Sequence, residues 1–231
     1  MYQDEHLGQA VDASRAWYQD IHALHGVSTV VRRGVWQSQG PPPPWHSGVM
    51  TLDRNVPVSE VLAAVVDRPS VGVADSFASL DLAEHGFTLL FEAHWLRLDT
   101  GRAPAASVVP DHWSRVTSSG QLATWSDLHD YAGVLTDALN HPRFEILARH
   151  RGPEMIAGAV LHDAGDSIGL SNIWSLEDVA GDIASVLAIA RTAHPGRPVT
   201  TYARGEELDI LVGNGFQVLG PHRVWARQPT V

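Results

Sequence analysis

One short pattern occurs twice in this chain, and it limits how the chain can fold. The segment GFTLLFEAHWLRL begins at Gly86 and the segment GFQVLGPHRVWAR begins at Gly215. In each copy, a glycine suited to end a helix is followed by a long stretch typical of a β-strand. The order strand, helix, strand, helix also recurs upstream of each copy, as expected of a repeated supersecondary unit. We therefore predict two related halves, although a length of 231 residues would also allow one large domain.

The spacing of apolar residues, with glycine and proline breaks, predicts the elements of each half. The four prolines of residues 41–44 exclude a central strand there, because proline offers no backbone donor. Residues 99–111 are rich in small residues and proline and predict a linker between a first domain, 1–103, and a second, 104–231. In the first half we expect helices over residues 4–24, 58–67 and 77–85 and strands over 28–38, 47–53, 70–74 and 87–98. In the second half we expect helices over residues 120–135, 176–194 and 205–214 and strands over 144–151, 154–165, 166–175, 197–203 and 216–228.

Composition bounds the class of protein. Hydrophobic residues make up 44% and charged residues 18% of the chain, which is ordinary for a globular protein with a sizeable core. No apolar run is long enough to cross a bilayer and the N-terminus lacks a signal pattern, so we expect a cytoplasmic protein without a membrane partner. The absence of cysteine excludes disulfides and thiol chemistry. The net charge of −10 disfavours nucleic acid as a partner, because it repels phosphate backbones.

The second half resembles a known superfamily. The segments AGAVLHDAGDSIGLSNIWS, RPVTTYA and NGFQVLGPHRVW, in that order, are similar to the GNAT superfamily of acyl-CoA-dependent N-acyltransferases. The resemblance is best over residues 121–227, and the first half matches only from PPPPWHSGVMTLD onward, as a trimmed copy. It implies an α/β fold, α+β in some classifications, made of two GNAT-like mixed-sheet halves in tandem.

The resemblance also implies where a cofactor would bind. In a GNAT-like fold, two central parallel strands separate, and their free backbone groups hydrogen-bond the pantetheine arm of coenzyme A. Here these strands would be residues 168–174 and 198–203. The implied cofactor is acetyl-CoA or another acyl thioester, and the residues placed to hold it are Ser171, Ile173, Trp174, Ser175 and Thr201.

Two features depart from the family pattern. The glycine-rich phosphate loop is replaced by SLEDVAGD, whose carboxylates compete with a diphosphate and suit a self-capped helix with Ser175 as its N-cap. The tyrosine that protonates the leaving thiolate in many members is replaced by Leu211 and, in the first copy, by Leu82. Tyr202 or a serine near the cleft is then the candidate proton donor. Asn172 either hydrogen-bonds the substrate, beside strand amides that hold the oxyanion, or satisfies a local backbone group. The first half has no glycine loop either, and we expect it to be degenerate.

The segment PPPPWH suggests where an acceptor would bind. A rigid proline tract that ends in Trp45 and His46 could form one wall of an acceptor pocket between the halves, with Trp36 on a preceding strand. The alternative is a stiff connector, with the tryptophans packed in the core.

Other kinds of site lack a recognisable motif. The 13 histidines show no spacing typical of metal ligands, so we expect no metal site. The chain contains no G-x-G-x-x-G dinucleotide loop.

The function that these patterns favour is an acyltransferase. It would move an acyl group from a thioester of coenzyme A or of an acyl carrier protein to an amine of a small molecule. The alternative is a degenerate or repurposed GNAT-like module that binds a ligand or partner, or performs other chemistry, without acyl-CoA. The two halves would pair either with each other or with a second chain in a homodimer.

Overall fold

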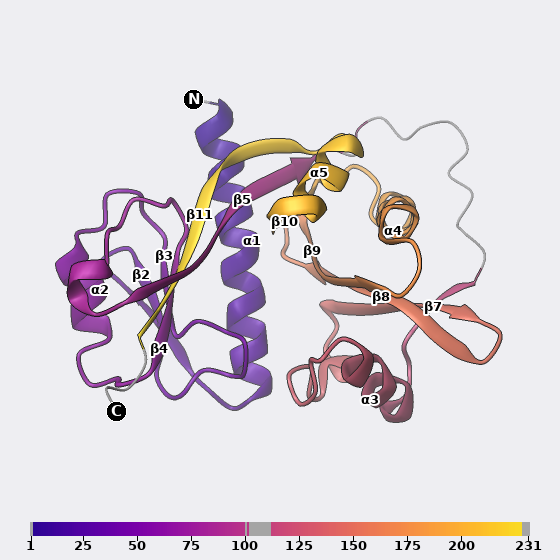
Figure 1. Ribbon diagram of the computed structural model, residues 1–231, viewed down its shortest axis with the longest axis horizontal. Coiled ribbons are helices and arrows are strands. Elements are labelled where there is room, and N and C mark those ends of the chain that lie inside the picture. Colours follow the sequence, from indigo (N-terminus) through magenta and orange to yellow (C-terminus); the bar gives the residue numbers. More distant parts are fainter. Residues whose placement is uncertain (1, 100, 102–111, 228–231) are drawn as a thin grey trace.

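The computed structural model describes residues 2–99, 101 and 112–227. These residues form one 11-stranded mixed sheet with helices on both faces (Figure 1). The strand order is β1-β2-β3-β4-β11-β5-β10-β9-β8-β7-β6. The predicted α/β class is therefore confirmed. Most of the predicted linker and the predicted boundary at residues 103 and 104 lie outside the described residues.

The helices and strands of the first half follow the predicted order, with two differences discussed below. The long helix α1 is Tyr2–Leu24, and the shorter α2 is Val58–Ala64. The strands are β1 (Thr29–Arg32), β2 (Val35–Ser38), β3 (Val49–Thr51), β4 (Val71–Asp75) and β5 (Thr88–Leu98).

The second half repeats this order. Its helices are α3 (Ser119–Leu128), α4 (Val179–Ala193) and α5 (Gly205–Gly213). Its strands are β6 (Trp113–Arg115), β7 (Phe144–Arg151), β8 (Glu154–Asp163), β9 (Ile168–Ser175), β10 (Val199–Ala203) and β11 (Gln217–Arg227). The sequence did not predict β6, and α3 ends earlier than expected, at Leu128.

The single strand predicted over residues 28–38 is wrong, because the chain folds there into a hairpin. Strands β1 and β2 pair antiparallel with Arg32 opposite Val35. The two residues between them, Arg33 and Gly34, both have positive φ, at 49° and 78°. Two consecutive positive φ angles are the signature of the tight two-residue turn that suits the twist of a hairpin.

The helix predicted over residues 77–85 is also wrong, because only the short 3₁₀ turn Ala83–His85 forms. The carboxylate of Asp75 accepts hydrogen bonds from the amides of Ser79 (3.2 Å) and Leu80 (2.9 Å). A side chain that binds these amides offers the backbone an alternative to a helical turn. The turn ends at Gly86 in a left-handed conformation, as its sequence position predicted.

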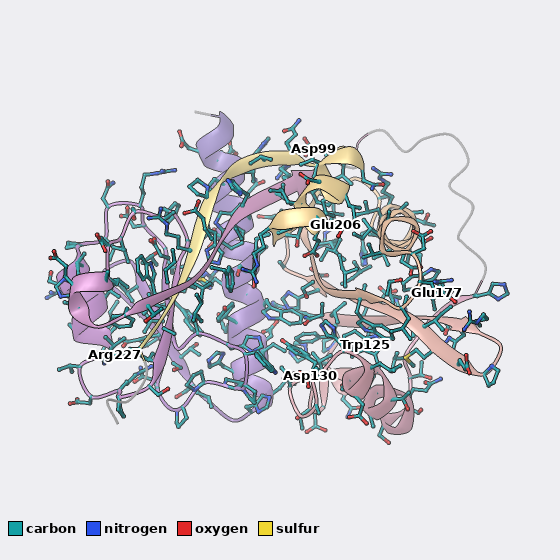
Figure 2. The ribbon with its side chains drawn as sticks, in the orientation of Figure 1. Asp99, Trp125, Asp130, Glu177, Glu206 and Arg227 are labelled. Carbon is teal, nitrogen blue, oxygen red and sulfur yellow. The ribbon has the colours of Figure 1, made fainter. Side chains whose placement is uncertain are left out.

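The final strand of each half lies beside the other half's strands. Strand β5 pairs antiparallel with β10 of the second half, and β11 pairs antiparallel with β4 of the first half. These two strands also pair with each other, so one continuous sheet joins the halves (Figure 1). Arg227, at the end of β11, reaches the first half, where its guanidinium donates to the carbonyl of Arg68 at 2.6 Å (Figure 2).

The helices pack on opposite faces of the sheet. Helix α1 crosses the joint between the halves and contacts β11, β5, β10 and β9, burying Leu7 and Val11 against Trp95. Helices α4 and α5 cover the other face, where Ile183 and Leu211 pack in one core cluster with Leu96 of β5. We call these the α1 face and the α4/α5 face. No helix in the described part of the chain is long and apolar enough to span a bilayer.

Candidate functional site

The parallel strands β9 and β10 separate after a short region of pairing. Only Val199 with Ile168 and Thr200 with Gly169 are in register. On its other side, β10 pairs with β5 along its whole length, so the separation is confined to the edge that faces β9. Backbone donors and acceptors along the separated edges have no strand partner, and such groups need hydrogen bonds from elsewhere.

A β-bulge shapes the separated part of β9. The register with β8 shifts between the pairs Val160–Ser171 and Gly158–Trp174, so that β9 carries one extra residue. Asn172 lies in this bulge with φ at 52°, a left-handed conformation that asparagine tolerates better than most residues. Its amide Nδ2 donates to Ser171 Oγ at 3.1 Å, and its Oδ1 accepts from Nε2 of His129 at 3.3 Å.

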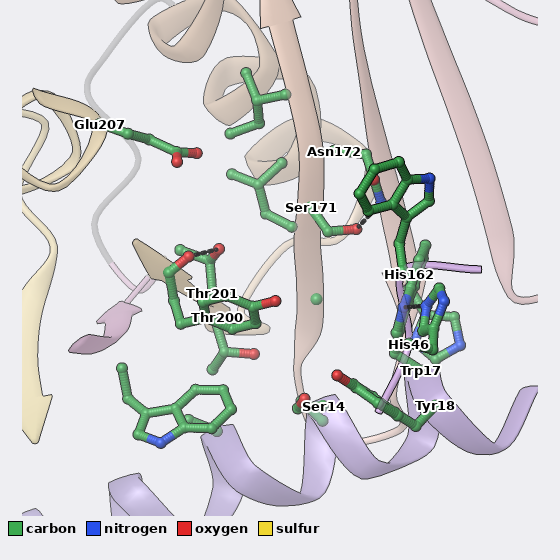
Figure 3. A pocket seen from close by; sticks show the side chains of 18 of the residues that line it. Ser14, Trp17, Tyr18, His46, His162, Ser171, Asn172, Thr200, Thr201 and Glu207 are labelled. Carbon is green, nitrogen blue, oxygen red and sulfur yellow. Dashed lines mark hydrogen bonds between the residues drawn. The ribbon is translucent and has the colours of Figure 1, made fainter. Parts of the chain in front are cut away.

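A cavity of about 340 Å³ opens at this separation (Figure 3). From the α1 face it is lined by residues that include Ser14, Tyr18 and Tyr131. From the α4/α5 face it is lined by Thr201 and Glu207 among others. A cavity with walls from both faces must pass between the strands, and its volume is in the range of small-molecule sites.

Burial lowers the pKa of two imidazoles that line the cavity, those of His46 and His129. Burial lowers the pKa of His46 to about 4. Its Nδ1 donates to the carbonyl of Pro44 at 2.8 Å, and its Nε2 accepts from the indole of Trp17 at 3.0 Å. His46 is therefore a structural part of the wall, since its only basic nitrogen is already an acceptor.

Glu207 is the one acidic or basic side chain, histidines aside, among the described residues that line the cavity. It lies in the first turn of α5 and is directed toward the separated strands (Figure 3). Burial raises the pKa of its carboxyl group. Within the described part of the chain, no side chain or backbone group forms a hydrogen bond or an ion pair with this carboxyl group. The carboxyl group is therefore available to interact with a molecule that enters the cavity.

Tyr202 presents a neutral phenol to the cavity. It lies opposite Trp95 in the register of β10 and β5, and the two rings meet edge to face with centroids 5.4 Å apart. Tyr202 is 37% exposed, and it lines the cavity. Burial raises the pKa of this phenol, so it keeps its proton and is a donor at neutral pH.

The predicted site residues fall into two groups. Seven line the cavity: Trp45, His46, Ser171, Asn172, Ile173, Thr201 and Tyr202. Three do not: Trp36, Trp174 and Ser175. Trp36 is buried beneath the wall against the ring of Tyr18, and Trp174 packs edge to face on Trp125 of α3.

The N-terminus of α4 is occupied by its own side chains. The N-cap is Asp178, which accepts from the amide of Gly181 at 2.9 Å, so the predicted N-cap at Ser175 is wrong by three residues. Ser175 Oγ instead accepts from the amides of Glu177 (3.2 Å) and Asp178 (3.0 Å). Asp182 forms a buried ion pair with Arg149 at 2.6 Å. The residues present do not fit a diphosphate, because the amides of Asp178 and Gly181 are already used and the side chains around the terminus are acidic.

The first half has a counterpart of the strand separation, but it is closed. Strands β3 and β4 pair in parallel only through Val49 with Val73 and Met50 with Ala74. Beyond this point Thr51 Oγ1 accepts from the amide of Ser76 at 2.9 Å. The Trp95 indole donates to the carbonyl of Ser76 at 2.7 Å. Side chains therefore satisfy the groups that are free in the second half.

Several residues of the cavity were not identified from the sequence. Glu207, His129 and Tyr131 carry no recognisable motif. Helix α1 was interpreted only as an amphipathic helix, yet Ser14 and Tyr18 line the cavity from it. The available signal was that Ser14 and Tyr18 are four residues apart, so that their polar groups lie on the same side of the helix, on an otherwise apolar face. Among the described residues, no three His, Asp or Glu side chains are placed to hold a metal ion.

A mixed sheet with two separated parallel strands, a bulge beside the separation and a helix after each strand defines the class of fold. Solved structures with this architecture include a GCN5-related N-acetyltransferase from Kribbella flavida, with a TM-score of 0.62 and 14% identity over 95% of this chain and 96% of that one. A putative acetyltransferase from the GNAT family of Novosphingobium aromaticivorans gives a TM-score of 0.58 at 10% identity, covering 88% and 92%. A functionally unknown conserved protein from Staphylococcus epidermidis gives 0.62 at 12%, covering 87% and 93%.

This chain therefore has the fold of the GNAT N-acetyltransferases along nearly its whole length. The tandem arrangement predicted from the repeat corresponds to the single sheet shared by both halves. At the level of sequence, no family model and no curated protein matches the chain.

Proposed function

We propose that the second half is an acyltransferase that moves an acyl group from a pantetheine thioester, borne by coenzyme A or a carrier protein, to an amine of a small molecule. The observation that carries this proposal is the end of the β9–β10 pairing at Thr200 and Gly169, with a cavity passing through the gap. The two amides of a pantetheine arm need donors and acceptors along an extended path. The separated strand edges supply both.

The reaction would be a direct attack of a neutral amine on the thioester carbonyl. The carbonyl oxygen gains negative charge as the C–N bond forms, and backbone amides at the bulge around Asn172 would donate hydrogen bonds to it. The bulge takes this part of β9 out of register with β8. The C–S bond then breaks, and the thiolate leaves with the electron pair.

Tyr202 would supply the proton for the leaving thiolate. Its phenol remains protonated at neutral pH because burial raises its pKa. Leu211, at the position of the usual family tyrosine, is fully buried in the core between α5 and the sheet and has no proton to donate. The proton lost by the amine passes to water in the cavity.

One observation favours the alternative of a GNAT-like module that binds a ligand without acyl-CoA. The N-terminus of α4, where the family holds a diphosphate, is capped by Asp178 and Ser175. This observation argues only against binding of the nucleotide end of the donor. The gap between the strands supports binding of the pantetheine end. The acyltransferase is therefore the better supported function.

The deciding experiment is acyl transfer from S-acetyl pantetheine or acetyl-CoA to a panel of small primary amines, with products detected by mass spectrometry. Thr201→Phe should abolish transfer by filling the gap between the strands, because Thr201 lines it. Thr192→Phe, on the exposed surface of α4, is the matched control and should be as active as the original chain. Absence of transfer to every amine, with no binding of either thioester, would refute the function.

The role of Tyr202 has a separate test. Tyr202→Phe should slow transfer from alkyl thioesters, whose thiolates need protonation. It should have little effect on aryl thioesters, whose thiolates are stable leaving groups, whereas a purely structural role would slow both equally.

A further inference from the structure

The start of α4 differs chemically from an anion-binding helix terminus, and this difference bears on the donor substrate. A helix N-terminus binds phosphate through free backbone amides. Here the amides of Glu177 and Asp178 donate to Ser175 Oγ, and the amide of Gly181 donates to Asp178 Oδ1. The amides of Asp178 and Gly181, two of the donors at this terminus, are thus already satisfied within the chain.

The space over this terminus is also filled. A Cβ placed on Gly181 would lie 2.3 Å from Asp178 Oδ2, so the carboxylate rests directly against the glycine backbone. The glycine that would allow a phosphate to approach is covered by a carboxylate of the chain itself. An anion could reach this glycine only if that carboxylate were removed or displaced.

The charge around the terminus is unfavourable for an anion as well. Glu177, Asp178 and Asp182 lie within the first turn and the segment before it. The guanidinium of Arg149 is committed to Asp182 at 2.6 Å and to Glu177 at 3.5 Å. Asp178 has no such counter-charge among the described residues, and it would repel a bound diphosphate.

The gap between the strands has the opposite character. It is lined on the α4/α5 face by Leu170, Ile173 and Thr201, which suit a thin uncharged chain with amide groups. Glu207 is the one carboxyl side chain among the described residues that line the gap, and a carboxyl oxygen can accept a hydrogen bond from an amide N–H. The gap therefore fits a pantetheine arm, and the α4 terminus does not fit the adenosine diphosphate that coenzyme A attaches to it.

We infer that the donor is recognised as a pantetheine thioester alone, with no contribution from a nucleoside diphosphate. This inference rests on the proposed function, because it names the donor of that reaction. Two sources supply such an arm: a free pantetheine thioester, or a phosphopantetheine arm attached to a protein.

The test compares the dissociation constants of S-acetyl pantetheine, S-acetyl phosphopantetheine and acetyl-CoA by calorimetry, which needs no acceptor. We expect the three constants to agree within about fivefold, a difference of about 1 kcal/mol. Acetyl-CoA binding more tightly than this would overturn the inference and leave the proposed function standing. Failure of all three to bind would overturn both. A carrier protein charged with acetyl-phosphopantetheine, added as a fourth probe, identifies the source: tighter binding indicates a protein-borne arm, and equal binding a free one.

A variant tests the cause. Asp178→Gly removes the carboxylate and frees the amide of Gly181, while glycine remains an acceptable N-cap. We expect this change to tighten acetyl-CoA binding relative to S-acetyl pantetheine. Asp67→Gly removes one exposed carboxylate from the first half and should leave that ratio unchanged. An unchanged ratio in Asp178→Gly would show that this carboxylate does not exclude the diphosphate.

Discussion

Replacing Gly158 with alanine should destabilise the protein, because two tryptophans pack against this glycine. A Cβ at this position would lie 2.2 Å from Trp125 Nε1 and 2.4 Å from Trp174 Nε1, where ordinary contacts are 3.4–4 Å. Trp125 is fully buried and Trp174 is 8% exposed. One or both indoles must therefore move by about 1 Å in a region packed to the density of a crystal.

The size of the effect follows from two contributions. Overpacking a core typically costs about 1–3 kcal/mol. The indole of Trp125 also donates to the carbonyl of Leu147 at 2.9 Å, and losing this buried bond costs about 1–3 kcal/mol. With partial relaxation we expect a loss of about 3 kcal/mol in the free energy of unfolding, which lowers Tm by about 6–12 °C in a chain of this size.

The measurement is thermal and urea unfolding of Gly158→Ala beside Gly120→Ala. Gly120 lies in the first turn of α3, on the same helix as Trp125, and a Cβ there meets nothing within 4 Å. Because alanine is a better helix former, Gly120→Ala should be neutral or stabilising by up to about 1 kcal/mol. The reasoning would be refuted if Gly158→Ala had the Tm of the original chain, or if the two variants changed Tm alike.

Three further predictions concern other parts of the fold. Burial holds the pKa of His46 and His222 at about 4, below the ordinary 6.5, so both are neutral in the folded state. The stability they contribute is present above pH 6.5 and is lost as the pH falls toward 4, by up to about 3 kcal/mol each. In urea unfolding between pH 7 and 4.5, the free energy of unfolding of His46→Gln should depend less on pH than that of the original chain. An identical pH dependence in the two proteins would contradict this. Asn172→Ala should lower the free energy of unfolding by about 1 kcal/mol more than Asn172→Gly does, because glycine accepts a φ of 52° without strain and alanine does not. Equal losses in the two variants would argue against strain at the bulge. Thr51→Val should lower the free energy of unfolding by about 1–3 kcal/mol by leaving the amide of Ser76 unsatisfied, and a neutral result would mean that the amide finds another acceptor.

Local features of the site were predictable from neighbouring residues. Tyr202 and Asn172 were placed beside the cleft because the segments around them resemble known strands, and both line the cavity. The self-capped start of α4 followed from the acidic residues near Ser175, although the cap itself is Asp178. In the hairpin at Arg33 and Gly34, the short break in the apolar residues was not interpreted as a turn, and the backbone angles revealed it.

The cavity walls were less accessible to sequence reasoning. Glu207 lies in the first turn of a helix, where acidic residues are common for reasons of helix polarity alone. Its position in the cavity depends on where α5 lies over the separated strands. The same holds for Ser14 of α1, which reaches the cavity only because α1 crosses the joint between the halves.

The sequence by itself determined the local elements: the amphipathic spacing of α1, the apolar strands, and the helix ends at Gly86 and Gly215. It also determined what chemistry is missing, since Leu211 has no proton to give. These properties depend on residues within a few positions of one another, through backbone angles and side-chain periodicity.

The tertiary structure alone decided how the halves combine. The exchange of β5 and β11 between the halves, the closed gap at Thr51 and the open gap beyond Thr200 arise from contacts between distant parts of the chain. Two similar strand patterns can pair in several ways with similar local energies. Which pairing forms is decided by the side chains that each arrangement buries together, and those are set only when the whole sheet has assembled.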